Sequence, residues 1–185
     1  MNGLPSKCAC NDVFNVTHAL SCKKGGFVSK RHDNIKDLFT ILLSKVCKSV
    51  ESEPHLIRLQ DEHLHYRTAN NTDEARLDIK ANGFWRHGQT TFFDVRVTHV
   101  NAMSNGNRDT TKIFHEHESA KKREYLQRVL EVEHESLTPL VMGTNGGMGE
   151  ECKKFVGRLH GGNFSPICSR LLLKSNCGLK LRVKK

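Results

Sequence analysis

The sequence predicts an α/β domain that follows a small metal-binding module. Three observations support this prediction. Residues 75–99 alternate apolar and polar side chains as two β-strands do, apolar residues at helical spacing flank this stretch, and cysteines cluster near the N-terminus. A chain of 185 residues is long enough to bury a core in one domain with an appendage.

The composition indicates a polyanionic partner. Lysine and arginine number 29 against 20 aspartates and glutamates, which gives a formal net charge of +9. Such an excess is typical of nucleic-acid-binding proteins, although an inert basic surface has the same composition. The sequence shows no N-terminal signal pattern and no apolar run near the roughly 20 residues that span a bilayer. We expect an intracellular, nuclear protein that binds DNA, or alternatively RNA, without membrane contact, and whose oligomeric state stays open.

The N-terminal cysteines predict a zinc site. Cys8, Cys10, His18 and Cys22 follow the spacing C-x-C-x7-H-x3-C. Three thiolates and one imidazole are a common ligand set of structural zinc, although one residue between the first two cysteines is tighter than the usual two to four. An odd number of cysteines without a signal peptide argues against a disulfide framework. We expect residues 1–30 to form a module that needs zinc to fold.

A basic segment and then a helix follow this module. The basic residues surround a Gly-Gly turn, and we expect them to contact phosphates; they are Lys23, Lys24, Lys30, Arg31 and His32. Apolar residues recur at helical spacing after Asp33, a good N-cap residue, and predict an amphipathic helix from Asp33 to about Ser49. Glu53-Pro54 ends this region because the residue before proline avoids helical torsion angles. A short strand is expected at residues 55–59.

Residues 75–99 predict two strands, each with an aspartate in its interior. The apolar residues that share a face within each strand are Leu77, Ile79 and Ala81 in the first and Phe93, Val95 and Val97 in the second. Aspartate is uncommon in strands, and antiparallel pairing can set Asp78 beside Asp94. Adjacent carboxylates repel unless a cation lies between them, so a divalent metal site is one interpretation. Two solvated aspartates on the wet face of an antiparallel sheet are the other.

A charged helix is predicted over residues 112–128. Phe114, Lys121 and Tyr125 fall on one face of this helix, whereas Lys122 lies about a quarter turn away. The sequence HEHE at residues 115–118 can bind a transition metal or can form a solvated helix face.

The remaining segments complete the domain. Residues 129–142 predict one or two strands, with Thr138-Pro139 at an edge or a break. The Gly-rich stretch that follows lacks the Lys-Ser/Thr of a phosphate loop and predicts a turn into a helix at about residues 150–159. Residues 161–185 form a short basic tail.

In this order the motifs resemble those of the restriction-like endonuclease domain of site-specific non-LTR retrotransposons, a branch of the PD-(D/E)XK nuclease superfamily. The resemblance covers most of residues 8–160. The matching positions are the C-C-H-C zinc motif, Arg31-His32, Glu53-Pro54, Leu77-Asp78 at the Pro-Asp position, Asp94 as the second acid, and Lys121 with Tyr125 four residues on. The resemblance implies that residues 31–160 form a restriction-endonuclease-like core of the α/β (α+β) class, with a mixed central sheet flanked by helices.

The resemblance also implies an activity, the hydrolysis of DNA phosphodiesters with Mg²⁺ or Mn²⁺. Asp78 and Asp94 would hold the metal with help from Glu53. Lys121 would orient the attacking water or stabilise the transition state, and Tyr125 joins the catalytic group. The basic residues at 23–32 and Lys122 would contact the DNA backbone.

Two residues depart from the motif. Leu77 replaces its proline, and Arg96 stands at the usual lysine position, where arginine can stabilise charge but cannot exchange a proton near neutral pH. The lysine role is therefore assigned to Lys121. A rival alignment makes Asp78-Ile79-Lys80 the acid-x-lysine element and leaves Asp94 without a role.

Three classes of function follow from these interpretations. The first is an endonuclease, as a stand-alone or decayed remnant of such an element. The second is a catalytically inactive, zinc-containing nucleic-acid-binding module. The third, a zinc-stabilised protein-interaction domain, fits the net charge less well.

Overall fold

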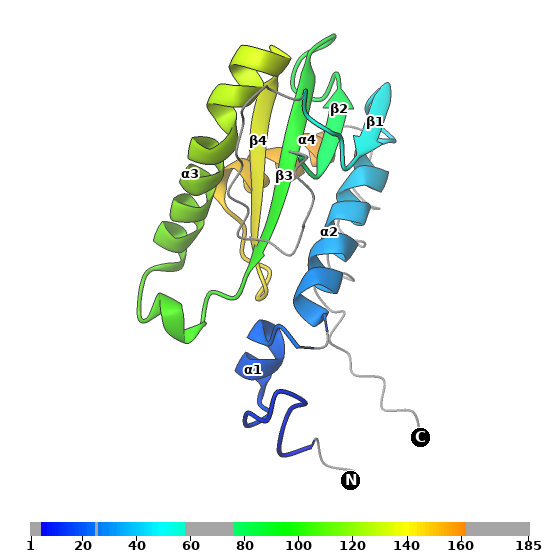
Figure 1. The fold of residues 1–185 in the computed structure, drawn as a ribbon. Coiled ribbons are helices and arrows are strands. Elements are labelled where there is room, and N and C mark those ends of the chain that lie inside the picture. Colours follow the sequence, from blue (N-terminus) through cyan, green and yellow to red (C-terminus); the bar gives the residue numbers. More distant parts are fainter. Residues whose placement is uncertain (1–4, 25, 58–75, 162–185) are drawn as a thin grey trace.

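The computed structural model describes residues 5–24, 26–57 and 76–161 (Figure 1). Its elements are α1 (Val16–Ser21), α2 (Phe27–Leu43), β1 (Ser49–Ser52), β2 (Ile79–Asn82), β3 (Thr90–Thr98), a 3-10 turn (Met103–Asn105), α3 (Thr110–Arg128), a π-helical turn (Val129–Glu133), β4 (Ser136–Gly143) and α4 (Glu150–Gly161). None of the helices in these ranges is long and apolar enough to cross a membrane.

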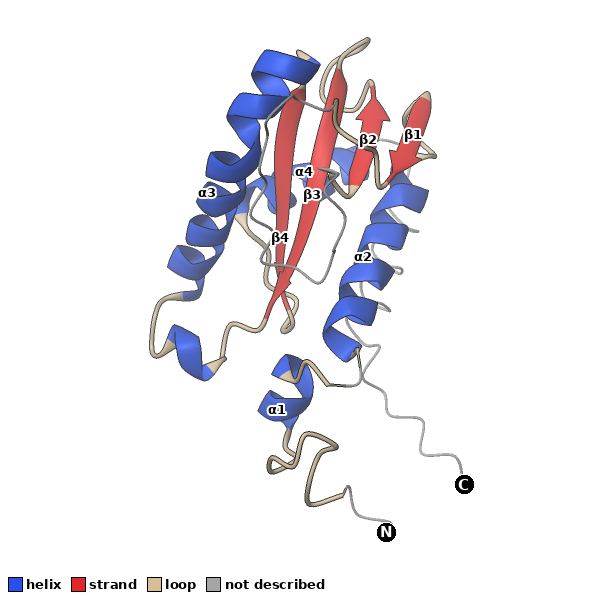
Figure 2. Ribbon diagram, viewed as in Figure 1, coloured by secondary structure: helices blue, strands red, loops and turns tan. Residues whose placement is uncertain are grey.

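The strands form one mixed sheet between two helical layers. Their order is β1-β2-β3-β4, with β1–β2 and β2–β3 antiparallel and β3–β4 parallel. Helix α3 connects the parallel strands and packs on one face of the sheet, while α2 and α4 cover the other (Figure 2). The predicted α/β class, a mixed sheet flanked by helices, is confirmed.

Strand β3 is buried on both faces. Phe93 and Val95 join the larger core cluster with α2 and α4, whereas Phe92 packs on the opposite face with Tyr125 and Val129. The alternation of apolar and polar side chains in the sequence therefore gives alternating burial in β2, in which buried and partly buried residues alternate, but not in β3. Parallel strands joined by a helical crossover are covered on both sides, and β3 is one of them.

The predicted face of the first strand needs one correction. Ile79 and Ala81 lie in the larger core cluster as expected, but Leu77 packs in the second cluster with Phe92. The strand begins only at Ile79 and Asp78 lies in a bend before it, so the two-residue alternation does not extend back to Leu77.

Helix α2 begins earlier and ends earlier than predicted. It starts at Phe27, because Gly26 adopts a left-handed φ of 69° that turns the chain into the helix. The expected cap at Asp33 lies within the helix, where the aspartate is exposed. The helix ends at Leu43, and the residues expected to finish it lead into β1.

The strand expected at residues 55–59 is reduced to one bridge in the described part of the chain. His55 pairs with Arg76 as an isolated antiparallel bridge, and residues 58 and 59 lie outside the described residues. So does the predicted basic tail beyond Gly161.

The second half of the chain follows the prediction more closely. Helix α3 starts two residues early, since the Asp109 carboxylate accepts hydrogen bonds from the backbone N–H groups of Thr111 and Lys112. Residues 129–133 form a π-helical turn rather than a strand. Pro139 lies in β4, which is an edge strand of the sheet, and there a missing N–H is tolerated.

Four phenylalanine rings pack together in the larger core cluster. The ring of Phe155 lies 5.0 Å from Phe39, 4.9 Å from Phe84 and 5.4 Å from Phe93 between centroids, and Phe155 is fully buried. Phe155→Ala should lower the free energy of unfolding by about 3–5 kcal/mol, because it removes apolar contacts and leaves a cavity. Urea titration measures this change.

Ile41→Ala is the matched control, since Ile41 is exposed on α2 and its truncation should change the free energy of unfolding by less than about 0.5 kcal/mol. Equal losses in the two variants would contradict the placement of Phe155.

Candidate functional site

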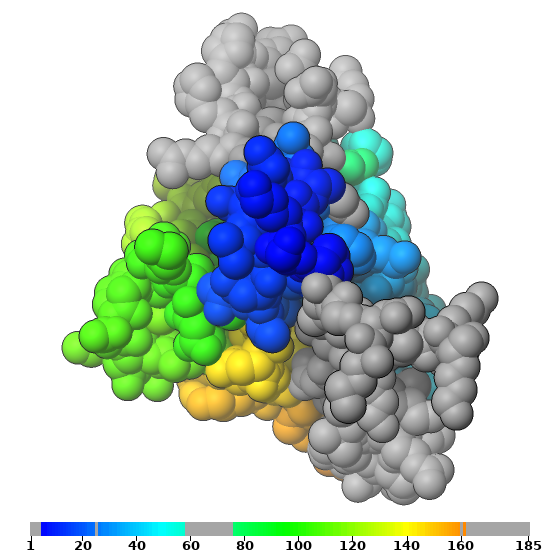
Figure 3. All heavy atoms as spheres, turned by 90° about the horizontal axis from the view of Figure 1, so that it is seen from below, coloured from blue at the N-terminus to red at the C-terminus, as the bar shows by residue number. Residues whose placement is uncertain are grey.

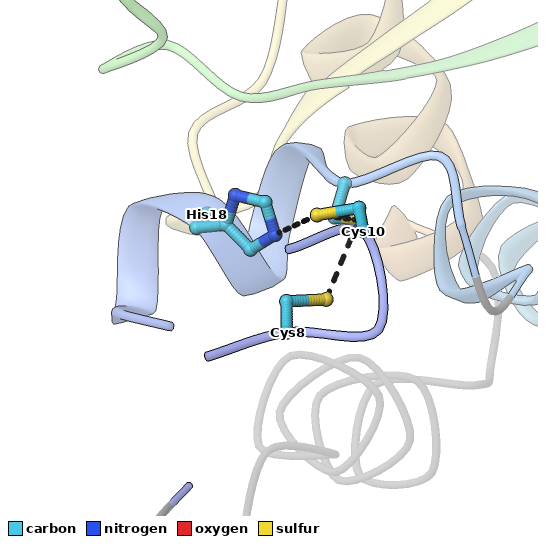
Figure 4. Close-up of side chains that lie close together, drawn as sticks. Cys8, Cys10 and His18 are labelled. Carbon is cyan, nitrogen blue, oxygen red and sulfur yellow. Dashed lines mark hydrogen bonds between the residues drawn. The ribbon is translucent and has the colours of Figure 1, made fainter. Parts of the chain in front are cut away.

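The four predicted zinc ligands come together in the N-terminal module. The ligand atoms of Cys8, Cys10, His18 and Cys22 all lie within 4.8 Å of one another. Figure 4 shows the sulfurs of Cys8 and Cys10 and the His18 ring drawn close together. In the described part of the chain this is the single group of three or more Cys, His, Asp or Glu side chains that can hold a metal ion in this way.

Distances within the cluster test whether zinc fits. The Cys8–Cys22 and Cys10–Cys22 sulfur pairs are each 3.8 Å apart, and the Cys10 sulfur lies 3.1 Å from His18 Nε2. Tetrahedral zinc with Zn–S bonds of about 2.3 Å requires sulfur–sulfur distances of about 3.8 Å. The cluster is therefore consistent with a structural Zn²⁺ bound by three cysteines and one histidine.

Local structure positions these ligands. The Asn15 side chain caps α1 by accepting a hydrogen bond from the His18 backbone N–H (2.8 Å), and the Cys22 N–H ends the helix on the His18 carbonyl (2.7 Å). The Cys10 backbone N–H and the His18 side chain lower the pKa of the Cys8 thiol to about 6. A lowered pKa favours the thiolate, which is the form that zinc binds.

Zinc content should depend on this cluster. We expect one zinc ion per purified chain, and we expect Cys22→Ser to lose it with partial unfolding of the module, because a structural zinc contributes on the order of 10 kcal/mol to the folding of its own module. Elemental analysis and circular dichroism measure both effects.

Cys47→Ser is the control, because Cys47 is a half-buried free cysteine outside the cluster and its replacement should leave the zinc content unchanged. Zinc-free wild-type protein, or equal zinc in Cys22→Ser, would contradict the prediction.

The N-terminal module that carries the Cys/His cluster contacts α2 through Arg31. Its Nη2 donates a 2.7 Å hydrogen bond to the Leu20 carbonyl near the end of α1, and Arg31 is half-buried. The module lies at the lower end of the view in Figure 1, and seen from below it (blue) lies in front of the rest of the chain (Figure 3). Among the predicted DNA contacts, Lys23, Lys24 and Lys30 are exposed, whereas Arg31 is engaged within the protein.

Asp94 is a buried carboxylate at the centre of the sheet. It is 6% exposed, and Lys121 Nζ lies 3.0 Å from its Oδ2 and 3.3 Å from its Oδ1. Burial raises the pKa of Asp94 to about 6, Lys121 opposes that shift, and the charge of Asp78 adds to it. A carboxylate in such surroundings favours proton or cation binding.

Asp78 lies beside Asp94 but is held from the opposite side. Ile79 pairs with Phe93 in antiparallel register, and one residue further along Asp78 lies opposite Asp94. Asp78 Oδ2 accepts a 2.6 Å hydrogen bond from the Val95 backbone N–H and lies 3.3 Å from His32 Nε2. The hydrogen bond between His32 and Asp78 raises the pKa of His32 to about 9, so the His32 imidazolium offsets the charge of Asp78. His32 is therefore part of this site as well as of the basic segment.

Glu53 does not join the two aspartates. Its carboxylate forms an ion pair with the buried Lys36 and another with Arg76 at 3.2 Å, and the bond to Lys36 lowers the pKa of Glu53. Glu53, Asp78 and Asp94 form no ligand group comparable with the Cys/His cluster in the described ranges. The Glu53 backbone N–H donates a hydrogen bond to the Asp78 carbonyl (2.8 Å), and the charge of Asp78 opposes the lowering of the Glu53 pKa.

The candidate lysines occupy three different environments. Lys121 contacts Asp94, and its Nζ lies 5.3 Å from the ring centroid of the buried Tyr125. Lys122 forms a 2.8 Å ion pair with Glu151. The ammonium of Lys80 lies 5.3 Å over the Phe92 ring. The structure thus brings Lys121, rather than Lys122 or Lys80, into ion-pair contact with the second aspartate.

Two buried charged residues were not predicted from the sequence. Lys36 lies on the buried face of α2, three residues before Phe39 and seven before Leu43. This helical spacing in the sequence could have indicated that Lys36 is buried. Glu118 lies on the Phe114 face of α3 and accepts a hydrogen bond from the Glu151 backbone N–H (3.0 Å) at the start of α4. Of the HEHE segment at residues 115–118, therefore, His115 and Glu116 are exposed to solvent, whereas Glu118 is buried.

Arg96 and His117 form a neighbouring polar group on the α3 side of β3. His117 Nε2 lies 3.3 Å from the Thr98 hydroxyl. Burial and the charge of Arg96 lower the pKa of His117 to about 4. His117 is therefore neutral near pH 7.

His117→Gln should remove a pH-dependent loss of stability. Between an unfolded pKa near 6.5 and a folded pKa of about 4, the unfolded chain binds a proton at His117 that the folded chain does not. The contribution of neutral His117 to the free energy of unfolding is therefore complete above the unfolded pKa. It is lost as the pH falls toward the folded pKa. From about pH 7 to about pH 4.5, the wild-type free energy of unfolding should decrease more steeply than that of the variant in urea titrations.

His115→Gln, at an exposed position of the same helix, serves as the control and should follow the wild-type curve. Parallel curves for the wild type and His117→Gln would show that His117 titrates alike in both states.

Comparisons with known proteins assign no family. Neither a scan against protein-family models nor a search of curated proteins finds a match for this chain.

Proposed function

We propose that the chain is a metal-dependent endonuclease that hydrolyses DNA phosphodiesters and is related to the restriction-like endonuclease domains of site-specific non-LTR retrotransposons. The observation that carries this proposal is the buried Asp94 carboxylate with Lys121 at 3.0 Å, beside Asp78 at the start of the neighbouring strand. Two carboxylates and a lysine on adjacent strands and a facing helix are a combination suited to phosphodiester hydrolysis.

The donor atoms at this position suit a hard divalent cation. Asp94 Oδ2 is buried and makes no hydrogen bond, although Lys121 approaches it as an ion pair. Mg²⁺ is commonly bound by one or two protein carboxylates, with water and substrate phosphate completing its shell. Asp78 and Asp94 would hold Mg²⁺ or Mn²⁺, which supplies an activated water and offsets charge on the phosphate. Glu53 would assist only after release from Lys36 and Arg76.

The protein's own groups have separate roles in this proposal. Lys121 is 17% exposed at its side chain, so its ammonium is held in place beside Asp94 and can stabilise negative charge that develops on a phosphate. Its Nζ also lies 5.3 Å from the ring centroid of the buried Tyr125, a cation–π contact that adds to the ion pair with Asp94. His32 and the Val95 N–H fix the Asp78 carboxylate. Lys23, Lys24 and Lys30, which are exposed, would contact the DNA backbone.

A second candidate is a catalytically inactive DNA-binding module with the same zinc site. The ion pairs of Glu53 with Lys36 and Arg76 favour it, because they occupy the third carboxylate of the motif. DNA binding without cleavage would select this alternative.

Cleavage of supercoiled plasmid by zinc-loaded protein tests the proposal. Wild type should nick DNA only when Mg²⁺ or Mn²⁺ is added. Lys121→Ala should lower the rate by roughly 100-fold with little loss of DNA affinity, the range seen when one transition-state donor is removed. Lys122→Ala is the matched control, since Lys122 pairs with Glu151, and it should only weaken binding slightly.

Lys80→Ala separates the two alignments. Normal cleavage by Lys121→Ala together with loss of cleavage in Lys80→Ala would replace the proposed site by one built on Asp78-Ile79-Lys80. Metal-independent cleavage, or none by the wild type, would overturn the nuclease proposal itself.

A further inference from the structure

Three cations on or next to α3 have a carboxylate partner. Lys121 pairs with Asp94 and Lys122 with Glu151. Arg108 pairs with Glu116 at 2.7 Å. In each of these pairs the two charges offset one another without a ligand.

Arg96 is different. It is half-buried on β3, and no carboxylate of the described residues forms an ion pair with it. Its neighbour on α3, His117, is neutral near pH 7 and so brings no compensating charge. A guanidinium removed from water without an anion raises the free energy of the folded state, and an anion bound there would lower it.

The position of Arg96 relative to the proposed catalytic group indicates which anion. Asp94 and Arg96 are two residues apart on the extended strand β3, so their side chains share a face. This spacing separates their Cα atoms by about 6.8 Å. The Arg96 side chain therefore leaves β3 one step along the strand from Asp94, in the direction of Thr98, and its charge acts on His117, which contacts Thr98.

We propose that Arg96 forms a phosphate-binding subsite that holds a DNA backbone phosphate next to the one that is cleaved. The planar guanidinium binds two phosphate oxygens at once, which a lysine ammonium does not do. Because Arg96 keeps its proton, it contributes charge and position rather than proton transfer. This assignment rests on the proposed function in that DNA is the ligand.

DNA binding in the absence of added divalent cation tests the subsite separately from cleavage. Fluorescence anisotropy of a labelled duplex would compare wild type, Arg96→Gln and Arg96→Lys across a series of salt concentrations. Arg96→Gln should reduce the slope of log affinity against log salt by about one, because one phosphate contact is lost. Arg96→Lys should keep most of the slope, which a purely structural role of Arg96 would not explain.

Arg123→Gln provides the matched control. It removes the same charge from an exposed position of α3 and should leave the slope close to that of the wild type. Thermal unfolding of each variant checks the fold. If Arg96→Gln does not fold, Arg96→Lys decides the matter, since loss of the two-point contact should then lower its affinity at least threefold at unchanged stability.

A chemical substitution in the DNA locates the contact. Duplexes with a single neutral methylphosphonate at successive positions should include one linkage at which the wild type loses affinity and Arg96→Gln does not. An unchanged salt slope in Arg96→Gln, equal methylphosphonate penalties in both proteins, or no DNA binding by the wild type would overturn the subsite. Binding with these effects but without Mg²⁺-dependent cleavage would instead overturn only the nuclease proposal.

Discussion

The burial of β3 between two helical layers is the constraint on which the site depends. Its apolar residues serve two cores at once, so the aspartate among them has little access to water. An isolated buried carboxylate would be costly, and Lys121 on α3 offsets that cost at 3.0 Å. Removing one partner of such a pair leaves the other buried and unpaired, so the ion pair also ties α3 to the sheet.

Asp78 is stabilised by the helical layer on the opposite face of the sheet, through α2. His32 on α2 contacts both the Asp78 carboxylate and the Val95 carbonyl (3.0 Å), while the Val95 N–H donates to Asp78. The residue before it, Arg31, binds the end of α1 in the zinc module. Two consecutive residues of α2 thus reach the metal-binding module on one side and the carboxylates on the other. The N-terminal module with the Cys/His cluster is thereby in contact with the helix that supports Asp78.

Much of this arrangement could be predicted from the sequence, and the failures have physical causes. Alternation revealed the strands, and helical spacing placed Lys121 with Tyr125 and away from Lys122. Alternation could not show that β3 is buried on both faces, because that follows from α2 and α4 packing on one face and α3 on the other. The pairing of Glu53 with Lys36 depends on how β1 meets α2, which no local pattern encodes. The early start of α2 depends on the left-handed Gly26 and not on the later aspartate.

The central claim is that Asp94 and Asp78 hold a divalent cation beside Lys121. Titration of zinc-loaded protein with Mn²⁺, followed by the loss of the free-ion electron paramagnetic resonance signal, tests it most directly. We expect the wild type to bind one Mn²⁺ and Asp94→Asn to lose that binding, while Glu116→Gln, on the exposed face of α3, retains it. No Mn²⁺ binding by the wild type, or equal binding by wild type and Asp94→Asn, would contradict the claim.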